Sequence, residues 1–406
     1  MRYILLTPNF KPNPGGIAEY LNQLWHYIGS HHPAHVFSTV PPHIPSNQKT
    51  EAMAYECQTL PDLPALEIST IETLTPQQAA LQFLQLKSYG QKVLLPLLRP
   101  YLSEPVRIFI GVWQPTTHFW CEALRKEHIP YSIFTYGLEI IYPPSSKVQQ
   151  WRQADLQAAA SVYACSAATV QLVRDRCQLT QPVQVVYPGV QPFINPQAIE
   201  KTAIAIREKW HLQNSQTLLS VGRLVPRKGF DLVLQSLPQL RQSFPHLRYL
   251  IAGEGADRER LTEIIHSLKL DSIVILLGSV DELTKAALYN ICEIFVMPNR
   301  FLDGKDWEGF GIVFLEAALM GKPSIGGNNG GVSEAIIHNQ TGLLVDTTNH
   351  QETENAIAQL FHNPGLRHQL GINARARASN TFTWQKSGQI LLERPFNGSK
   401  TISLLS

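Results

Sequence analysis

The chain has 406 residues, of which 44% are hydrophobic and 16% are charged. This composition is typical of a globular protein, and the length allows two domains. The formal net charge is only +2, and basic and acidic residues balance at 13 to 12 up to residue 190 and at 21 to 20 beyond it. Because neither half is strongly basic, the charge gives no support for a nucleic-acid-binding function.

Cysteine spacing and apolar segments bear on the cellular compartment. The first apolar run stops at Pro8, which is too short for a signal peptide, and the uncharged stretch 156–173 contains too many polar residues for a membrane span. No C-x-x-C pair and no zinc-like spacing occurs, so we expect free thiols in a reducing environment. The five cysteines are at positions 57, 121, 165, 177 and 292. We therefore expect a cytoplasmic protein without a transmembrane helix.

Short apolar runs alternate with segments of helical length along the whole chain, which argues for parallel sheets covered on both faces. In the first half, the predicted buried strands are residues 3–7, 106–112, 131–136 and 161–165. In the second half, they are residues 217–222, 247–253, 273–278, 294–298, 323–327 and 342–346. Two such series predict two doubly wound α/β domains, with a boundary where prolines and a glycine interrupt the pattern at residues 185–196. Ligands of such domains bind in the loops after the strands.

The loop after the first predicted strand contains NPGGIAEYL, residues 13–21. The backbone N–H groups of Gly15 and Gly16 could meet an anion at the start of the helix that follows. An ordinary tight turn explains a glycine pair equally well.

The loop after strand 217–222 contains SVGRLVPRKGFD, residues 220–231, with cations at 223, 227 and 228. Cations close to the end of a buried strand are suited to a diphosphate. Arg223 could engage two phosphate oxygens through its planar guanidinium, and Lys228 would add a compact charge. A solvated charge cluster is the alternative, but it would not need the flanking glycines.

The next loop, AGEGADRERL at residues 252–261, lacks the complete G-x-G-x-x-G pattern, and no acidic residue follows at the required place. We therefore reject a nicotinamide-dependent dehydrogenase.

The segment WEGFGIVFLEA, residues 307–317, places two carboxylates eight positions apart around two glycines. Gly309 and Gly311 can expose backbone N–H groups where residues 312–319 begin a helix. The unpaired N–H groups of a first helical turn attract anions and hydroxyl groups, with Glu308 at the rim and Glu316 further along the helix. Alternatively, both acidic residues only complement the helix dipole.

Taken together, these motifs resemble glycosyltransferase family 4, whose members have the GT-B fold. The resemblance covers nearly the whole chain, and residues 297–317 look especially like the bacterial phosphatidyl-myo-inositol mannoside mannosyltransferases. It rests on NPGGIAEYL, SVGRLVPRKGFD, LRYLIAGEGADRERL (247–261), IVILLGSVDELTKAALYNICEIFVMP (273–298), WEGFGIVFLEA and GKPSIGGNNGGVSEAI (321–336). The implied fold is α/β, with two Rossmann-like doubly wound domains facing a cleft.

The resemblance implies a role for each matching residue. Arg223 and Lys228 would hold the diphosphate of a nucleotide-sugar donor, and Glu316 would bind the ribose hydroxyls. Glu308 and the amides of Gly309, Phe310 and Gly311 would hold the transferred sugar. The base would lie against Gly278, Ser279 and Val280, and Gly16 would face the donor from the first domain.

The implied reaction transfers a hexose of mannose or glucose type to a hydroxyl of a glycan or lipid-linked acceptor, with retention and without a metal or cofactor. From chemistry alone, Glu308 could be a nucleophile. The family favours a front-face substitution in which the leaving phosphate takes the acceptor proton, so we assign Glu308, together with Arg223 and Lys228, to charge stabilisation and sugar binding.

The sequence departs from the family after strand 131–136. Relatives usually have histidine before glycine there, whereas this chain has Tyr136 before Gly137. A tyrosine can donate a hydrogen bond to a sugar but shares no charge at neutral pH. Tyr136 and Glu139 are therefore candidates for sugar or acceptor contact, and so is His118, although a histidine beside two aromatic residues is often only a packed helix residue.

Acceptor recognition is expected in the first domain. Lys87, Lys92 and Arg99 lie among leucines in a stretch without acidic residues, which could contact an anionic membrane. A buried helix with snorkelling lysines is the alternative, and we expect Gly90 and Pro96 to interrupt any long helix. Residues 40–74 predict a long excursion that closes over the acceptor.

The resemblance also implies that the chain end, which has a helical pattern at 382–396, crosses back to the first domain. The expected domains are an acceptor-binding domain at 1–190, completed by a helix at about 385–406, and a nucleotide-sugar-binding domain at 191–384. Two other functions stay open: an epimerase of a nucleotide sugar, and a non-catalytic nucleotide-sugar-binding protein.

Overall fold

The computed structural model describes residues 1–13, 15–39, 54–61, 74–141, 145–302 and 306–393. The chain divides into two compact units. The first comprises Met1–Gly189 and Trp384–Ser406, and the second comprises Val190–Thr383. The chain therefore enters the second unit once and returns from it once.

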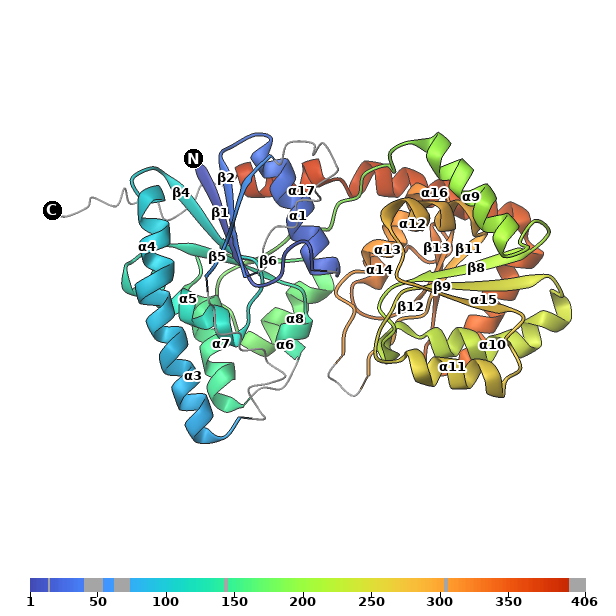
Figure 1. Ribbon diagram of the computed structural model, residues 1–406, viewed down its shortest axis with the longest axis horizontal. Helices are drawn as coiled ribbons and strands as arrows, with labels where there is room; N and C mark the ends of the chain where they lie inside the picture. The colour runs from blue at the N-terminus through green and yellow to red at the C-terminus, as the bar shows by residue number, and fades with distance from the viewer. Residues whose placement is uncertain (14, 40–53, 62–73, 142–144, 303–305, 394–406) are drawn as a thin grey trace. The chain divides into compact units, whose positions relative to one another are not determined.

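The first unit contains a parallel sheet of seven strands among the described residues, in the order β3-β2-β1-β4-β5-β6-β7 (Figure 1). β1 lies between β2 and β4, so the strand order changes direction there, and Tyr3 pairs with Ala34 on one side while Arg2 pairs with Val106 on the other. The strands are β1 (Arg2–Thr7), β2 (Ala34–Ser38), β3 (Glu56–Thr59), β4 (Val106–Ile110), β5 (Tyr131–Thr135), β6 (Ser161–Ala164) and β7 (Val183–Val185).

Helices cover this sheet, with α1 packed against α17, and α5 packed against both α3 and α7. The return of the chain thus completes the first unit, because α17 is the last described helix. The helices are α1 (Gly16–Gly29), α3 (Pro76–Tyr89), α4 (Leu95–Leu98), α5 (Pro115–Lys126), α6 (Leu138–Ile141), α7 (Ser146–Ala158), α8 (Ala167–Cys177) and α17 (Trp384–Glu393).

The expected break at Gly90 and Pro96 is wrong. A π-helical turn, Gly90–Leu94, joins α3 to α4, and a 3-10 turn, Arg99–Tyr101, continues beyond α4, so helical backbone extends from residue 76 to residue 101 (Figure 1). Gly90 serves close packing, because a Cβ there would lie 2.9 Å from the carbonyl oxygen of Phe119 in α5. Pro96 is tolerated within the first two residues of α4.

The second unit contains a parallel sheet of six strands among its described residues, in the order β10-β9-β8-β11-β12-β13. All six strands predicted in this half of the chain are present. They are β8 (Gln216–Val221), β9 (Leu247–Ala252), β10 (Val274–Gly278), β11 (Ile294–Met297), β12 (Ser324–Gly327) and β13 (Gly342–Val345).

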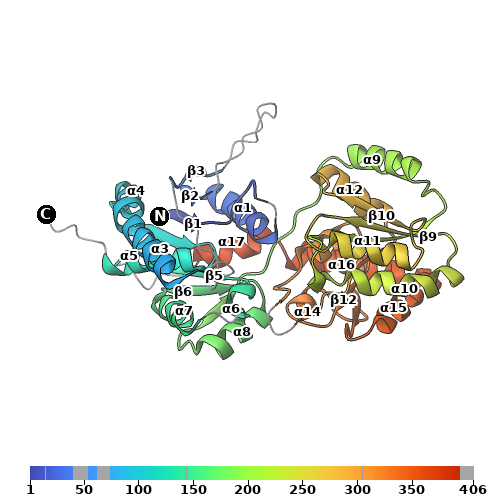
Figure 2. The ribbon, with the colours of Figure 1, turned by 60° about the horizontal axis from the view of Figure 1, so that its bottom comes forward.

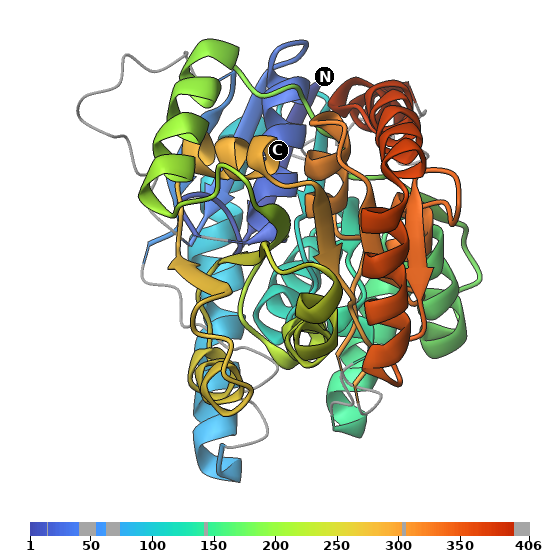
Figure 3. The same cartoon turned by 90° about the vertical axis from the view of Figure 1, so that its right-hand side faces the viewer.

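The helices of this unit cover its sheet and extend to both edges. α9 packs against α12 (Figure 2), and α15 and α16 pack on β13 at the other edge (Figure 3). They are α9 (Pro196–Lys209), α10 (Phe230–Ser243), α11 (Arg258–Ser267), α12 (Glu282–Ile291), α13 (Ile312–Leu319), α14 (Val332–Ala335), α15 (His350–His362) and α16 (Pro364–Thr381).

The excursion expected at residues 40–74 and the expectation of no transmembrane helix can also be compared with the structure. The excursion expected at 40–74 contains β3, which pairs with β2, and its residues 40–53 and 62–73 lie outside the described part of the chain. Within the described part, no helix combines the length and the apolar character needed to cross a membrane.

The connection from β8 to α10 depends on a glycine. Gly229 has a left-handed φ of 74°, and a Cβ there would lie 2.2 Å from the carbonyl oxygen of Pro298, which follows β11. Only glycine lets these two loops approach so closely.

We predict that Gly229→Ala lowers the stability of the second unit by at least about 2 kcal/mol, because it adds a left-handed alanine and a steric clash. Thermal unfolding of the whole chain measures the change. Gly365→Ala in α16 is the matched control, since a Cβ there meets no atom within 4 Å. Equal unfolding midpoints for the two variants would contradict the packing argument.

Candidate active site

The second sheet brings two loops together at one place on its carboxyl edge. β8 lies between β9 and β11, so the loop at 222–229 and the loop at 298–311 leave neighbouring strands at the point where the strand order changes direction. This is where open α/β sheets bind ligands. The backbone N–H of Arg300 donates to the carbonyl oxygen of Arg227 over 2.9 Å and ties the loops together.

A buried ion pair joins the same loops through their side chains. Lys228 Nζ donates to Glu308 Oε2 over 2.5 Å, although each of these residues is only 8% exposed. Asn299 Nδ2 donates to the same oxygen over 2.8 Å, and Arg227 Nε lies 3.8 Å from it. Glu308 Oε1 accepts no hydrogen bond from the described residues, so one carboxylate oxygen is fixed and the other is available to a ligand.

The charges around Glu308 keep it ionised. Burial raises the pKa of Glu308. The positive charges of Lys228 and then Arg227 lower it by a larger amount, so the pKa lies below its ordinary value. For Lys228, burial lowers the pKa, and the negative charge of Glu308 opposes this change. Lys228 and Glu308 thus each oppose the effect of burial on the other's pKa.

We predict that Glu308→Leu destabilises the second unit by about 3 to 5 kcal/mol, because it leaves the Lys228 ammonium buried without its partner. The double variant Lys228→Met/Glu308→Leu should recover most of the loss, since it removes both charges. Chemical unfolding of the three proteins measures the difference. A double variant no more stable than the single one would show that the unpaired charge is not the cause.

The cations of the loop at 222–229 differ in their surroundings. Arg223 is exposed and has no hydrogen-bond or ion-pair partner within the described part of the chain. Arg227, the second of the three cations noted in the sequence, pairs with Asp306 over 3.2 Å. Arg300 braces the loop, because its Nη2 lies 2.7 and 2.9 Å from the two carboxylate oxygens of Asp231. Arg223 is therefore the cation of this loop that is open to a ligand.

The helix α13 begins directly beyond Glu308. Its N-cap is Gly311, with φ of 89°, and no side chain caps its first turn. Phe310 is 3% exposed and packs edge-on against Phe382 at 5.3 Å, so only its backbone can serve a ligand. The Gly331 N–H donates to the Glu308 carbonyl oxygen over 3.1 Å, which holds the start of this segment.

Glu316 lies in the second turn of α13 and contacts α12. Its Oε1 accepts from Lys285 Nζ over 2.9 Å and its Oε2 accepts from the Tyr289 hydroxyl over 2.8 Å. These two partners, like Asn299, were missed in the sequence. The signals were present: Lys285 and Tyr289 lie four residues apart on one helical face, and Asn299 follows a predicted strand.

The expected base-binding residues lie at the other end of the same carboxyl edge. Gly278 ends β10, and its carbonyl oxygen accepts from the Gly253 N–H after β9 over 2.8 Å. Ser279 and Val280 follow it. The strands β9 and β8 separate this loop from β11, so the candidate residues of the second unit spread along one edge of the sheet.

In the first unit, the candidates lie in different surroundings. Gly16 begins α1 and is exposed. Tyr136 is 8% exposed, packs edge-on against Tyr20 at 5.5 Å, and its buried hydroxyl has no hydrogen-bond partner among the residues that the structure describes. Glu139 is 4% exposed and accepts from the Tyr136 N–H over 2.6 Å; burial raises its pKa. Glu139 is thus engaged by its own loop.

His118 is held by its neighbours in α5 and α7. Its Nδ1 lies 2.8 Å from Asp155 Oδ2, and its ring stacks on Trp151 at 4.5 Å. Asp155 also accepts from Trp113 Nε1 over 2.9 Å and pairs with Arg125. This is the arrangement of a packed, hydrogen-bonded histidine.

A hollow of about 510 Å³ lies between α3, α5 and α7, beside His118 and Trp151. Lys87 at its wall lies 3.6 Å from Glu122, and Lys147 lies 5.0 Å from the ring centre of Phe83. Both cations therefore face groups of the same unit.

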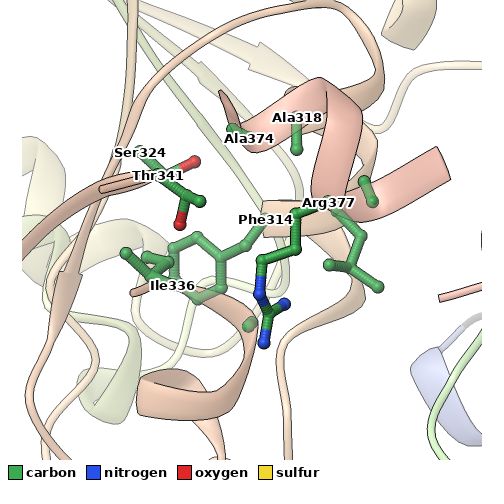
Figure 4. Close-up of a pocket in the computed structure, with 10 residues that line it drawn as sticks. Phe314, Ala318, Ser324, Ile336, Thr341, Ala374 and Arg377 are labelled. Carbon is green, nitrogen blue, oxygen red and sulfur yellow. The ribbon is translucent and has the colours of Figure 1, made fainter. Parts of the chain in front are cut away.

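A second cavity lies behind α13, between that helix and α16 (Figure 4). Its volume of about 10 Å³ is sufficient for one water molecule at most. Ala318 of α13 packs there against Ala374 and Ala378 of α16. Across the described residues, no group of three or more His, Cys, Asp or Glu side chains is arranged to hold a metal ion.

Comparisons with known proteins define the class. Residues 203–377 match the family model of the glycosyl transferases group 1. A GDP-mannose-dependent alpha-(1-6)-phosphatidylinositol monomannoside mannosyltransferase of Mycolicibacterium smegmatis is 31% identical over 189 residues, which are 46% of this chain and 50% of that protein. A D-inositol 3-phosphate glycosyltransferase of Pseudarthrobacter chlorophenolicus is 33% identical over 180 residues, 43% and 41% of the two chains. The chain thus spans half or less of the length of these relatives.

Solved structures match over the whole chain. The Anabaena protein HepE, in complex with UDP and glucose, has a TM-score of 0.73 with 20% identity, covering 97% of this chain and 98% of HepE. A sucrose-phosphate synthase from Thermosynechococcus elongatus has a TM-score of 0.74 with 20% identity, covering 96% and 97%. The predicted GT-B fold is confirmed. The predicted resemblance to glycosyltransferase family 4 and its phosphatidylinositol mannoside mannosyltransferases is confirmed as well, by the match of residues 203–377 to the family model and by the similarity to the mannosyltransferase.

Proposed function

We propose that the chain is a retaining, metal-independent glycosyltransferase that moves a hexose from a nucleotide-diphosphate sugar to a hydroxyl of a glycan or lipid-linked acceptor. The observation that carries the proposal is the meeting of Lys228 and Glu308 where the strand order changes direction, beside the uncapped start of α13. This arrangement lies within the segment that matches the glycosyl transferases group 1.

The proposed diphosphate site combines three sources of positive charge. Arg223 is exposed and without a partner in the described part of the chain, so it can turn its guanidinium to two phosphate oxygens. Lys228 adds a fixed charge. The unpaired N–H groups at the start of α13 add a partial positive charge that would attract the departing phosphate. Together they stabilise the leaving group in the way that a metal ion does in other enzymes.

In the proposed reaction, Glu308 binds the sugar and is not a nucleophile. Its Oε2 is already engaged by Lys228 and Asn299, which lowers its reactivity, while Oε1 remains able to accept from a sugar hydroxyl. The bond from the anomeric carbon to the diphosphate breaks, and the acceptor oxygen bonds to that carbon on the same face. The acceptor proton passes to the departing phosphate oxygen, so the charges balance.

The relatives support a hexose donor and leave its base open. The mycobacterial relative is named as GDP-mannose-dependent, and HepE was solved with UDP and glucose. The relative's printed substrate, phosphatidylinositol monomannoside, supports a lipid-linked acceptor. Acceptor binding by the first unit, donor contact by Gly16, and sugar or acceptor contact by Tyr136 remain predictions from the sequence. A cytoplasmic location and a peripheral membrane contact remain predictions as well.

Product analysis tests the proposal. The protein is incubated with GDP-mannose or UDP-glucose and a panel of glycan and lipid-linked acceptors, with and without a chelator. We expect a free nucleoside diphosphate, a hexose on the acceptor with the anomeric configuration of the donor, and no loss with chelator. A product that keeps its nucleotide would instead indicate an epimerase, and unchanged donor would indicate a binding protein.

We predict that Arg223→Ala weakens nucleoside-diphosphate binding about 10- to 100-fold, because a charge-assisted contact to phosphate is lost. Calorimetric titration with GDP and UDP measures the change. Arg241→Ala is the control, since Arg241 is an exposed cation in the last turn of α10 and donates to the Lys269 carbonyl oxygen. Equal affinities of the two variants would exclude Arg223 from the site.

A further inference from the structure

The second carboxylate of the site, Glu316, is held by two residues of a neighbouring helix. Lys285 and Tyr289 of α12 reach it from one side, and Tyr289 is fully buried. The side chains of Glu316 and Lys285 are 14% and 15% exposed. Glu316 is therefore mostly enclosed, with a narrow part of its surface left open.

Each oxygen of Glu316 receives one of these donors. Lys285 Nζ is 2.9 Å from Oε1, and the Tyr289 hydroxyl is 2.8 Å from Oε2. The same hydroxyl lies 3.4 Å from the Val313 carbonyl oxygen, so its single hydrogen is better placed for the carboxylate. Because a carboxylate oxygen can accept about two hydrogen bonds, one acceptor position remains on each oxygen.

Lys285 is itself held in place. Its Nζ also lies 3.0 Å from Glu282 Oε2 on the same helix. Burial lowers the pKa of Lys285. The negative charges of Glu316 and Glu282 raise it by a larger amount, so the pKa lies above its ordinary value. Lys285 is thus a cationic donor held against Glu316. Two adjacent hydroxyl groups of a ligand can occupy the two open acceptor positions, one on each oxygen.

We propose that Lys285 and Tyr289 are positioning residues that fix Glu316 as a two-oxygen acceptor for the adjacent 2′ and 3′ hydroxyls of the donor ribose. The inference rests on the proposed function. It makes α12 responsible for the distinction between ribonucleotides and deoxyribonucleotides, although neither residue needs to touch the ligand. Without Lys285 the carboxylate loses its countercharge, and without Tyr289 it is free to rotate.

The test compares the affinities of GDP and UDP with those of 2′-deoxy-GDP and 2′-deoxy-UDP by calorimetry. In the wild type, we expect the ribose form to bind about tenfold more tightly or better. In Tyr289→Phe and Lys285→Met, this ratio should fall to about one to three, with weaker binding of the ribose form. Lys285→Arg should keep most of the ratio, since it retains the charge.

The matched control is Tyr249→Phe, which also removes a buried tyrosine hydroxyl from the second unit. Tyr249 is 2.7 Å from Ser220 Oγ in the core of the sheet. It should change the unfolding temperature and leave the ribose-to-deoxyribose ratio at the wild-type value. If Tyr249→Phe also loses the ribose-to-deoxyribose ratio, the effect of Tyr289→Phe would be explained by a general loss of stability. This outcome would overturn the proposal.

The remaining outcomes separate this inference from the function on which it rests. If the wild type discriminates and both α12 variants keep its ratio, the positioning role is overturned and the proposed function stands. If Glu316→Ala keeps the ratio, Glu316 does not bind the ribose, and the inference fails in the same way. A wild type that binds neither GDP nor UDP nor any other nucleoside diphosphate overturns the proposed function, and the inference falls with it.

Discussion

The buried ion pair between Lys228 and Glu308 is the interaction on which the site depends. A lysine and a glutamate that are each 8% exposed are stable only when they face one another, since either charge alone would lose its hydration without compensation. Their contact fixes the loop after β8 against the loop after β11. It thereby sets the position of Arg223 on one side and the start of α13 on the other.

The surrounding structure holds this pair by backbone and side-chain contacts that bind no ligand. Asn299 orients the carboxylate, and Arg300 anchors the loop through Asp231 and through the carbonyl oxygen of Pro226, 3.1 Å away. Because Lys228 and Asn299 both donate to Oε2, the direction of Oε1 is set as well. The carboxylate is held in place by the protein alone, so a ligand would not have to order it.

The strands predicted from the sequence are those with continuous apolar runs, because a central parallel strand is buried on both faces. β2, β3 and β7 were not predicted. His35 and Ser38 interrupt β2 with polar residues, β3 alternates between exposed and half-buried positions at the sheet edge, and β7 has only three residues. The helix break expected at Gly90 was wrong because the pattern did not show that the glycine is needed for contact with α5.

The sequence predicted the residues of the candidate site but not the contacts between them. Arg223, Lys228, Glu308 and Glu316 follow predicted strands or begin a predicted helix, so their places in the fold are readable from local pattern. Their partners are not, because Lys228 and Glu308 are 80 positions apart and Lys285 and Glu316 are 31 apart. Such pairs depend on how strands are ordered in the sheet, which the local sequence does not encode.

The alanine contact between α13 and α16 gives the chain a remote means of adjusting its chemistry. Ala318, Ala374 and Ala378 let the two helices lie close together, with almost no free volume behind α13. A larger side chain at any of the three would require α13 or α16 to shift, and a shift of α13 would move Glu316 with it. Methyl groups in a contact between two helices would thus set the position of a charged side chain of the candidate site.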